Sequence, residues 1–283
     1  MPASPTVRRR RLTAELCRLR EVSGRTIDEI ARDVGVSKSS LSRIENGIVV
    51  PRIPVLRGLL AVYGVTGEHA VWLEQLCRDA AKKGWWELAG SASMRDATRT
   101  LIGLEGEATR INQFSINVLT GLVQVRSYAH AVLKTALPNA RKDEIETLVE
   151  TRIRRQERLG DARLWVILAE ELFLRPVGGA SAMREQIEHL VELTDSFPRA
   201  TVQVLGREGG EHPGMSGPFT VMGFDPSTDP EVVYVEGNLW DAVIEDADIV
   251  GAYRNNFEIL QATALSPADS RARLLRYVKE YST

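Results

Sequence analysis

Residues 25–47 read RTIDEIARDVGVSKSSLSRIENG, and their spacing predicts two short helices joined by a tight turn. Thr26 is a good N-cap, and Glu29 three residues later completes a capping box, so a helix is expected over 27–34. Gly35 follows this helix, and glycine can turn the chain there without a steric penalty from a Cβ atom. The segment therefore predicts a helix with a defined start and a defined end.

A second short helix is expected over 38–46, with Ser37 as its cap. Small and apolar residues recur at helical spacing through both helices. The predicted core of this helix pair is Ile30, Ala31, Val34, Gly35, Val36, Leu41 and Ile44. Two short helices that cross steeply need a small residue at the crossing and glycine at the turn, and Ala31 and Gly35 meet both needs. The pattern predicts a helix-turn-helix unit.

The positive charge of the chain is concentrated at its start. The 283 residues have a formal net charge of −2, yet residues 1–66 carry twelve Lys and Arg against six Asp and Glu. This first segment is therefore +6, and the remainder of the chain is −8. A basic segment with a helix-turn-helix pattern favours binding to DNA phosphates, although a solvated basic face without a partner gives the same count.

Residues 25–65 resemble the Cro/C1 (Xre-type) helix-turn-helix family, and the tail SRIENG…P…L…LL…YGV carries the most specific part of the resemblance. The resemblance implies an all-α, five-helix DNA-binding domain over residues 1–83, whose third helix enters the major groove. The implied helices cover about 8–22, 26–34, 37–45, 53–63 and 68–83.

In this family the exposed residues of the third helix face the edges of bases. Carried over to this chain, the expected base-contacting residues are Lys38, Ser39, Ser40, Ser42 and Arg43. Lys38 can donate to guanine or to a phosphate, whereas serine hydroxyls discriminate weakly between bases. Arg43 has a competing structural interpretation, which is an ion pair with Glu45 or Asp28.

Phosphate contacts are expected around this helix and at the start of the chain. The expected phosphate-contacting residues are Arg8, Arg9, Arg10, Arg11, Thr26, Ser37, Asn46 and Arg52, together with the Gly47 amide. The arginine run 8–11 is interpreted as an arm that neutralises phosphates or lies in a minor groove. The family usually has glutamine where this chain has Ile27, so one phosphate contact of the family is not expected here.

Residues 84–283 predict a larger second domain, and 43% hydrophobic residues in the whole chain exclude global disorder. The predicted helices cover 96–115, 127–136, 139–159, 180–193, 247–265 and 267–281. The predicted strands cover 164–169, 201–205, 219–224 and 231–236, with a loop at 209–218. These elements indicate an α+β fold with a small, mostly antiparallel sheet. Trp85 and Trp86 mark the predicted boundary and are expected to pack there.

Segments such as LEGEATRI, LWVILAE, EHPGMSGPFTVMGF and ALSPADSR, spread over 85–280, resemble the domain of unknown function in actinobacterial regulators of the WhiJ type. The resemblance implies a regulator whose second domain is a sensor, a dimeriser or a partner-binding module. Such proteins are often encoded beside a small partner protein, and some are antitoxin-like. Relatives usually have Pro-Gly-Leu-Leu-Gln-Thr where this chain has TGLVQV at 120–125, so an effector or partner bound there would differ.

An enzyme is not expected. The four histidines are scattered and no metal-binding, phosphate-binding or nucleophile motif is present, so no catalytic residue, metal site or cofactor is predicted. Glu211, His212 and Ser216 share one glycine-rich loop, but catalysis needs groups held at fixed separations of about 3 Å. The basic run at 151–160 is expected to be a solvated helix face with a Glu150–Arg154 pair.

The two cysteines, Cys17 and Cys77, fit a reduced compartment, and no apolar run is long enough to span a membrane. We therefore expect a cytoplasmic, nucleoid-associated and repressor-like regulator that binds double-stranded DNA as a homodimer through helix 37–45 and binds no membrane. Two alternatives stay open. One is an antitoxin-like module that binds a small partner protein. The other is a sensor of an unknown small-molecule effector, with a pocket between the sheet and the helices of 96–160.

Overall fold

The structure is a computed structural model that describes residues 7–81, 96–157, 159, 162–224, 230–237 and 241–282. The chain divides into two compact units, Met1–Leu104 and Glu105–Thr283, and each is described by itself. The predicted boundary after residue 83 falls outside the described residues, as do Trp85 and Trp86.

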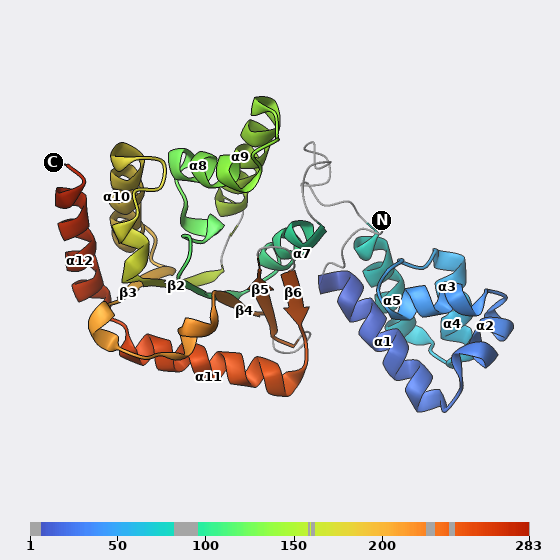
Figure 1. Cartoon of the computed structure of the whole chain (residues 1–283). Helices are drawn as coiled ribbons and strands as arrows, with labels where there is room; N and C mark the ends of the chain where they lie inside the picture. Colours follow the sequence, from blue (N-terminus) through green and yellow to red (C-terminus); the bar gives the residue numbers. More distant parts are fainter. Residues whose placement is uncertain are drawn as a thin grey trace. The chain divides into compact units, whose positions relative to one another are not determined.

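Residues 7–81 of the first unit form five helices (Figure 1). They are α1 (Val7–Ser23), α2 (Ile27–Val34), α3 (Lys38–Glu45), α4 (Ile53–Val62) and α5 (Gly67–Ala80). The predicted capping box is confirmed, because the Thr26 side chain accepts from the Glu29 N–H and the Glu29 carboxylate accepts from the Thr26 N–H. Gly35 ends α2 in the left-handed conformation at φ 76°. The bundle therefore has the predicted helices in the predicted order.

The five helices enclose one apolar core. Its buried members are Leu12, Leu16, Leu19, Ile30, Ala31, Leu41, Ile44, Leu56, Leu59, Leu60, Leu73, Leu76 and Cys77. Val34 and Val36 are partly buried against this core, and Gly35 is exposed in the turn. A Cβ at Gly58 would lie 3.0 Å from Cγ1 of Val34, so the glycine allows α4 to approach α2 closely. This shared core fixes the position of α3 relative to α2.

A six-stranded sheet forms the centre of the second unit (Figure 1). Its strands are β1 (Arg110–Ser115), β2 (Arg163–Ala169), β3 (Ala200–Leu205), β4 (Phe219–Gly223), β5 (Val232–Glu236) and β6 (Asp241–Ile244). The strand order is β3-β2-β1-β4-β5-β6, with β1, β2 and β3 parallel and the other three pairings antiparallel. The predicted α+β class is confirmed.

The predicted helix over 96–115 was wrong in its second half. The helix α7 (Asp96–Glu105) ends at Glu105, and β1 follows between β2 and β4. Ile111 and Phe114 are both buried, but they belong to opposite faces of a strand. The same spacing of three also suits one face of a helix, so periodicity could not separate the two structures. The edge strand β6 was not predicted either.

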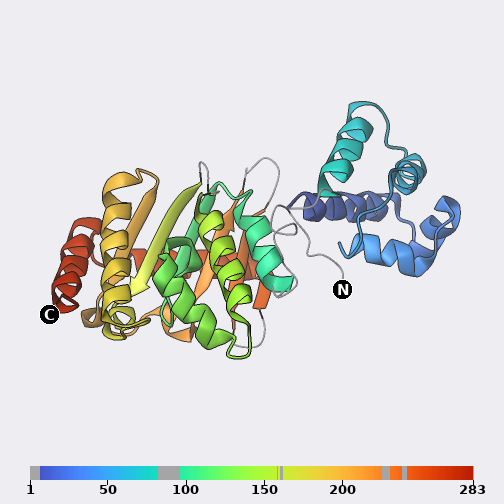
Figure 2. The same cartoon turned by 90° about the horizontal axis from the view of Figure 1, so that it is seen from above.

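Helices cover both faces of this sheet. They are α8 (Arg126–Ala136), α9 (Lys142–Glu157), α10 (Ala180–Ser196), α11 (Ala247–Thr263) and α12 (Pro267–Glu280). Figures 1 and 2 show α8, α9 and α10 on one face, α11 across the other, and α12 beside β3. The core on the α11 side includes Phe114, Ile167, Phe219, Phe257 and Leu260. The predicted loop at 209–218 begins at the end of one short 3-10 turn, Arg207–Gly209, and contains a second, Pro213–Ser216.

Candidate nucleic-acid interface

The helix α3 has one buried side and one exposed side. Leu41 and Ile44 are 0% and 4% exposed and pack in the core of the bundle. Most of the predicted base-contacting residues lie on the surface, namely Lys38, Ser39, Ser40 and Arg43, while Ser42 is half-buried. The packing of α3 therefore presents a polar and basic face to solvent.

The two basic residues of this face differ in their contacts. Lys38 Nζ donates to Asp28 at 2.7 Å, and both side chains are more than half exposed. The alternative ion pair of Arg43 was wrong, because Asp28 pairs with Lys38 and Glu45 pairs with Arg20. Within the described part of the chain, the Arg43 guanidinium makes no hydrogen bond or ion pair.

Glu45 at the end of α3 ties this helix to α1, which the sequence did not predict. Arg20 Nε donates to both carboxylate oxygens of Glu45, at 2.8 and 3.0 Å, and Glu45 is 9% exposed. The Cys17 thiol donates to the Glu45 carbonyl at 3.4 Å, and burial raises the pKa of this thiol. The hydroxyl of Tyr63 is buried, and burial raises its pKa to about 12. The contacts of Arg20 and Cys17 with Glu45 fix the C-terminal end of α3 against α1.

Several predicted phosphate-contacting groups already have partners at the ends of helices. The Ser37 hydroxyl accepts from the Ser40 N–H at 3.1 Å and caps α3. The Asn46 amide donates to the carbonyl of Ser42 at 2.7 Å. The Gly47 N–H donates to the Ile44 carbonyl at 3.0 Å, and the Thr26 hydroxyl belongs to the capping box. A phosphate would have to share or displace these bonds, so these contacts stay predictions.

The arginine run 8–11 lies inside α1 and forms its first turns, rather than an extended arm. No acidic residue occupies the first turn of α1, so four cations sit at the positive end of the helix dipole, where an anion is favoured. Arg52 precedes α4, and its exposed side chain makes no hydrogen bond or ion pair with the residues described. Ile27 packs against the core, so it does not replace the family's glutamine at the surface.

The predicted solvated face at 151–160 was wrong for two of its arginines. Arg155 donates twice to Glu105, at 2.7 and 2.9 Å, and both side chains are buried. Arg152 donates to the side-chain carbonyl of Gln124 at 2.7 Å, and burial lowers the pKa of Arg152 to about 10. The predicted Glu150–Arg154 pair is not formed, because Glu150 pairs with Arg126. This side of α9 therefore faces the interior.

The segment 120–125, considered as a binding segment, lies inside the second unit. Its residues Leu122, Val123 and Gln124 are buried. Gln156 donates to the carbonyls at positions 121 and 124, and Gln186 donates to the carbonyl of Val123. The segment is thus held by side chains of α9 and α10.

The three polar residues of the glycine-rich loop, Glu211, His212 and Ser216, are not joined into one cluster in the structure. Among the described residues, no hydrogen bond joins Glu211, His212 and Ser216. The His212 ring instead lies edge-on to Phe114, with 5.7 Å between the ring centres. In the described ranges no group of three His, Cys, Asp or Glu side chains could hold a metal ion, and no described helix is long and apolar enough to cross a membrane.

Comparison with known families gives two matches. Residues 11–73 match a helix-turn-helix domain, which supports a DNA-binding regulator. Residues 98–276, more than half of the chain, match the domain of unknown function DUF5753. No curated protein and no solved structure matches the chain significantly. The two matches confirm the resemblance to a helix-turn-helix regulator with a C-terminal domain of unknown function, and the chain belongs to the DUF5753 family.

Proposed function

We propose that the protein is a sequence-specific, repressor-like regulator of transcription that reads double-stranded DNA through α3. The observation that carries this proposal is the exposed face of α3, where Lys38 and Arg43 stand opposite the buried Leu41 and Ile44. The guanidinium of Arg43 has no partner among the described residues, so its donors are free for guanine O6 and N7. The +6 charge of residues 1–66 supplies the attraction to phosphates.

Lys38 can join Arg43 at the DNA at little cost. Its ion pair with Asp28 is exposed on both sides, and pairs of this kind contribute only about 0–1 kcal/mol. A base or phosphate can therefore take the place of Asp28. Arg52 and the arginines at 8–11 act on phosphates in this proposal, and the serines of α3 add weak base contacts.

The protein acts as a homodimer in this proposal. The eight residues of α3 span about 12 Å, which is enough for only a few base pairs. Two copies of α3 placed about 34 Å apart would reach successive turns of the major groove and read a longer site. The DUF5753 unit, which follows the DNA-binding helices in the sequence, is proposed to control this binding as a ligand- or partner-dependent module.

The test is a comparison of two double variants of the full chain. A binding site is first selected from random duplex DNA, and affinities are then measured by fluorescence anisotropy at one salt concentration. The Lys38→Ala/Arg43→Ala variant should lose about a hundredfold or more of its specific affinity, because each good base contact contributes about 1–3 kcal/mol. Circular dichroism checks that the variant is folded.

The matched control removes two arginines of the same bundle from another surface. Arg57 and Arg78 both pair with Glu74 on α5, so Arg57→Ala/Arg78→Ala removes the same charge away from α3. This control should keep the specific affinity within about threefold, the change expected for charges that only steer association. Equal losses in the two double variants, or no loss in the first, would contradict the assignment of α3.

A further inference from the structure

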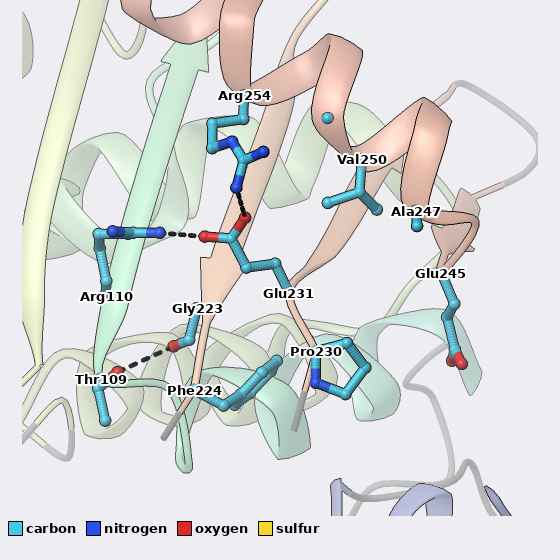
Figure 3. A pocket seen from close by; sticks show the side chains of 11 residues that line it. Thr109, Arg110, Gly223, Phe224, Pro230, Glu231, Glu245, Ala247, Val250 and Arg254 are labelled. Atoms are coloured by element: carbon cyan, nitrogen blue, oxygen red, sulfur yellow. Dashed lines mark hydrogen bonds and ion pairs between the residues drawn. The ribbon is translucent and has the colours of Figure 1, made fainter. Parts of the chain in front are cut away.

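A pocket of about 550 Å³ lies in the second unit, where the end of β4 and the start of β5 meet the first turns of α11 (Figure 3). Its volume falls in the range of about 300–1,000 Å³ that is usual for small-molecule sites. The residues that decide what it can bind are Phe224, Pro230 and Val250 on an apolar wall and Arg110, Glu231 and Arg254 on a charged wall. The pocket therefore combines an apolar surface with a cluster of charges.

Two arginines of this pocket share a single carboxylate. One oxygen of Glu231 accepts from Arg110, and the other accepts from Arg254 Nη1 at 3.1 Å (Figure 3). The side chains of Arg110 and Arg254 are 48% and 54% exposed, whereas that of Glu231 is 19% exposed. Each guanidinium has five N–H donors, and the bond to Glu231 uses one donor of each arginine. These three groups carry a net charge of +1, which the carboxylate of Glu245 on the same lining offsets, and the two arginines keep N–H donors available for a second anion.

Gly251 gives an independent indication that the pocket is kept open. It lies inside α11 and lines the pocket, and the nearest atom to a Cβ built there is Arg254 Nη2 at 4.0 Å. Glycine inside a helix costs about 0.5–1 kcal/mol relative to alanine. None of the described neighbours requires this position to lack a side chain, so what the glycine provides is space beside the guanidinium of Arg254.

We propose that this pocket binds a small organic monocarboxylate with a compact apolar body. A planar carboxylate matches the fork of a guanidinium, so Arg110 and Arg254 would hold the charged end. Phe224 and the side of α11 would cover the apolar body. Glu231 and Glu245 both line the pocket, and their negative charge opposes a second anionic group on the ligand. This site lies wholly in the second unit and does not depend on DNA binding.

The test is isothermal titration calorimetry with the full chain at fixed ionic strength. The probes are 2-naphthoate, its uncharged isostere 2-naphthamide and the dianion 2,6-naphthalenedicarboxylate. The protein should bind 2-naphthoate at least about tenfold more tightly than the other two, because only this probe offers one carboxylate and one apolar body. Absence of 2-naphthoate binding, or equal affinity for the amide, would overturn the proposal.

Three variants locate the binding site. Arg254→Gln should weaken 2-naphthoate binding about tenfold and leave the amide unaffected. The control Arg271→Gln removes an arginine of α12 that pairs with Asp195, and it should change neither affinity. Glu231→Gln should tighten 2-naphthoate binding several-fold, because it removes the carboxylate that competes for both arginines. Loss of binding in Glu231→Gln would contradict the competing role of Glu231, and an unchanged affinity in Arg254→Gln would place the ligand elsewhere.

Gly251→Leu separates an open site from a structural glycine. Leucine favours the helix and would fill the space beside Arg254, so the melting temperature should stay the same or rise while 2-naphthoate binding is lost. A lower melting temperature would show that the fold itself requires glycine there. Wild-type affinity in this variant would show that the ligand does not enter this pocket. Either result would contradict the proposal.

Discussion

The helical unit and the sheet-containing unit differ in how many polar side chains they bury. Among residues 7–81, Glu45 is the one charged or polar side chain that the structure describes as buried, and the core is otherwise apolar. The second unit buries many more, among them Glu105, Gln113, Gln124, Arg155, Glu170, Gln186 and Gln203. The bundle thus keeps most of its charged side chains at the surface, whereas the second unit uses many buried polar side chains to join distant segments.

Gln203 illustrates how the second unit uses a buried amide. It accepts from the Trp165 ring N–H at 2.8 Å and donates to the Leu265 carbonyl at 2.9 Å. One side chain therefore joins β3 to β2 and to the segment that follows α11. Because a buried amide without partners is costly, each such contact specifies one arrangement of the segments that it joins. The difference between the units can be measured by removing one polar contact at a time.

The largest effect is expected at the buried pair of Arg155 and Glu105. Arg155→Met should destabilise the second unit by about 3–5 kcal/mol, because it leaves the Glu105 carboxylate buried without its cation. Hydrogen–deuterium exchange in increasing urea measures this for each unit separately. The control is Arg154→Met, since Arg154 is the exposed neighbour on the same helix. A loss below about 1 kcal/mol in Arg155→Met would contradict the structural role of the pair.

A smaller and pH-dependent effect is expected at Glu170, which follows β2. Burial alone would raise the pKa of Glu170, but hydrogen bonds from Arg273, the Arg207 N–H and Tyr277 hold it below its usual value. Glu170→Gln should cost about 2–3 kcal/mol at neutral pH, through the loss of charge-assisted hydrogen bonds.

The pH dependence of this cost follows from the lowered pKa. The stabilising carboxylate form of Glu170 is present above the unfolded pKa of about 4.3, and its contribution is lost as the pH falls through the lower folded value. Urea unfolding from pH 7 down to pH 3 should therefore show the difference from Glu170→Gln shrinking below about pH 4. The exposed neighbour gives the control, Glu171→Gln. A difference that stays constant with pH would argue against a charged Glu170 in the folded protein.

The third effect concerns the one buried carboxylate described in the bundle. Arg20→Met should destabilise the bundle by about 1–2 kcal/mol, because Glu45 loses its charged partner while Arg20 itself is partly solvated. Arg18→Met on the same helix is the control, since its pair with Glu15 is on the surface. Exchange of amides in α3 should rise more than exchange in α4. A uniform change over the whole bundle would show that the pair does not hold α3 in particular.

The sequence predicted most of the bundle because its signals are local. Thr26, Glu29, Gly35 and Ser37 act within a few residues of their own positions, so the ends of α2 and α3 could be located without tertiary information. The partner of Glu45 could not be found in the same way, because Arg20 is 25 residues earlier in the chain. The apolar spacing predicted the buried side of α3, whereas its base-contacting residues were carried over from the family resemblance and the contacts of their side chains could not be predicted.

The second unit was harder to predict because its decisive contacts are long-range. The strand β1 pairs with segments more than 50 residues away, and these pairings override the helical spacing of its apolar residues. Arg110 was therefore assigned to a helix, although it lies in β1 and bonds Glu231. The pocket that includes Arg110, Glu231 and Arg254 could not be inferred before these pairings were known. Patterns of neighbouring residues in the sequence cannot predict a site whose residues come together only through such long-range pairings.

The smallest predicted effect concerns the N-cap of α2, Thr26, and tests how much a capping hydrogen bond predicted from the sequence contributes to the stability of the bundle. Thr26→Ala removes the N-cap of α2 and should cost about 1 kcal/mol, measured by urea unfolding of the bundle. Thr66 is also an N-cap, but its side chain makes no capping hydrogen bond, so Thr66→Ala should cost clearly less. Equal costs would show that threonine acts through backbone preference alone. A larger loss at Thr26, confined to α2 in hydrogen exchange, would show that one local hydrogen bond stabilises the helix on which α3 rests.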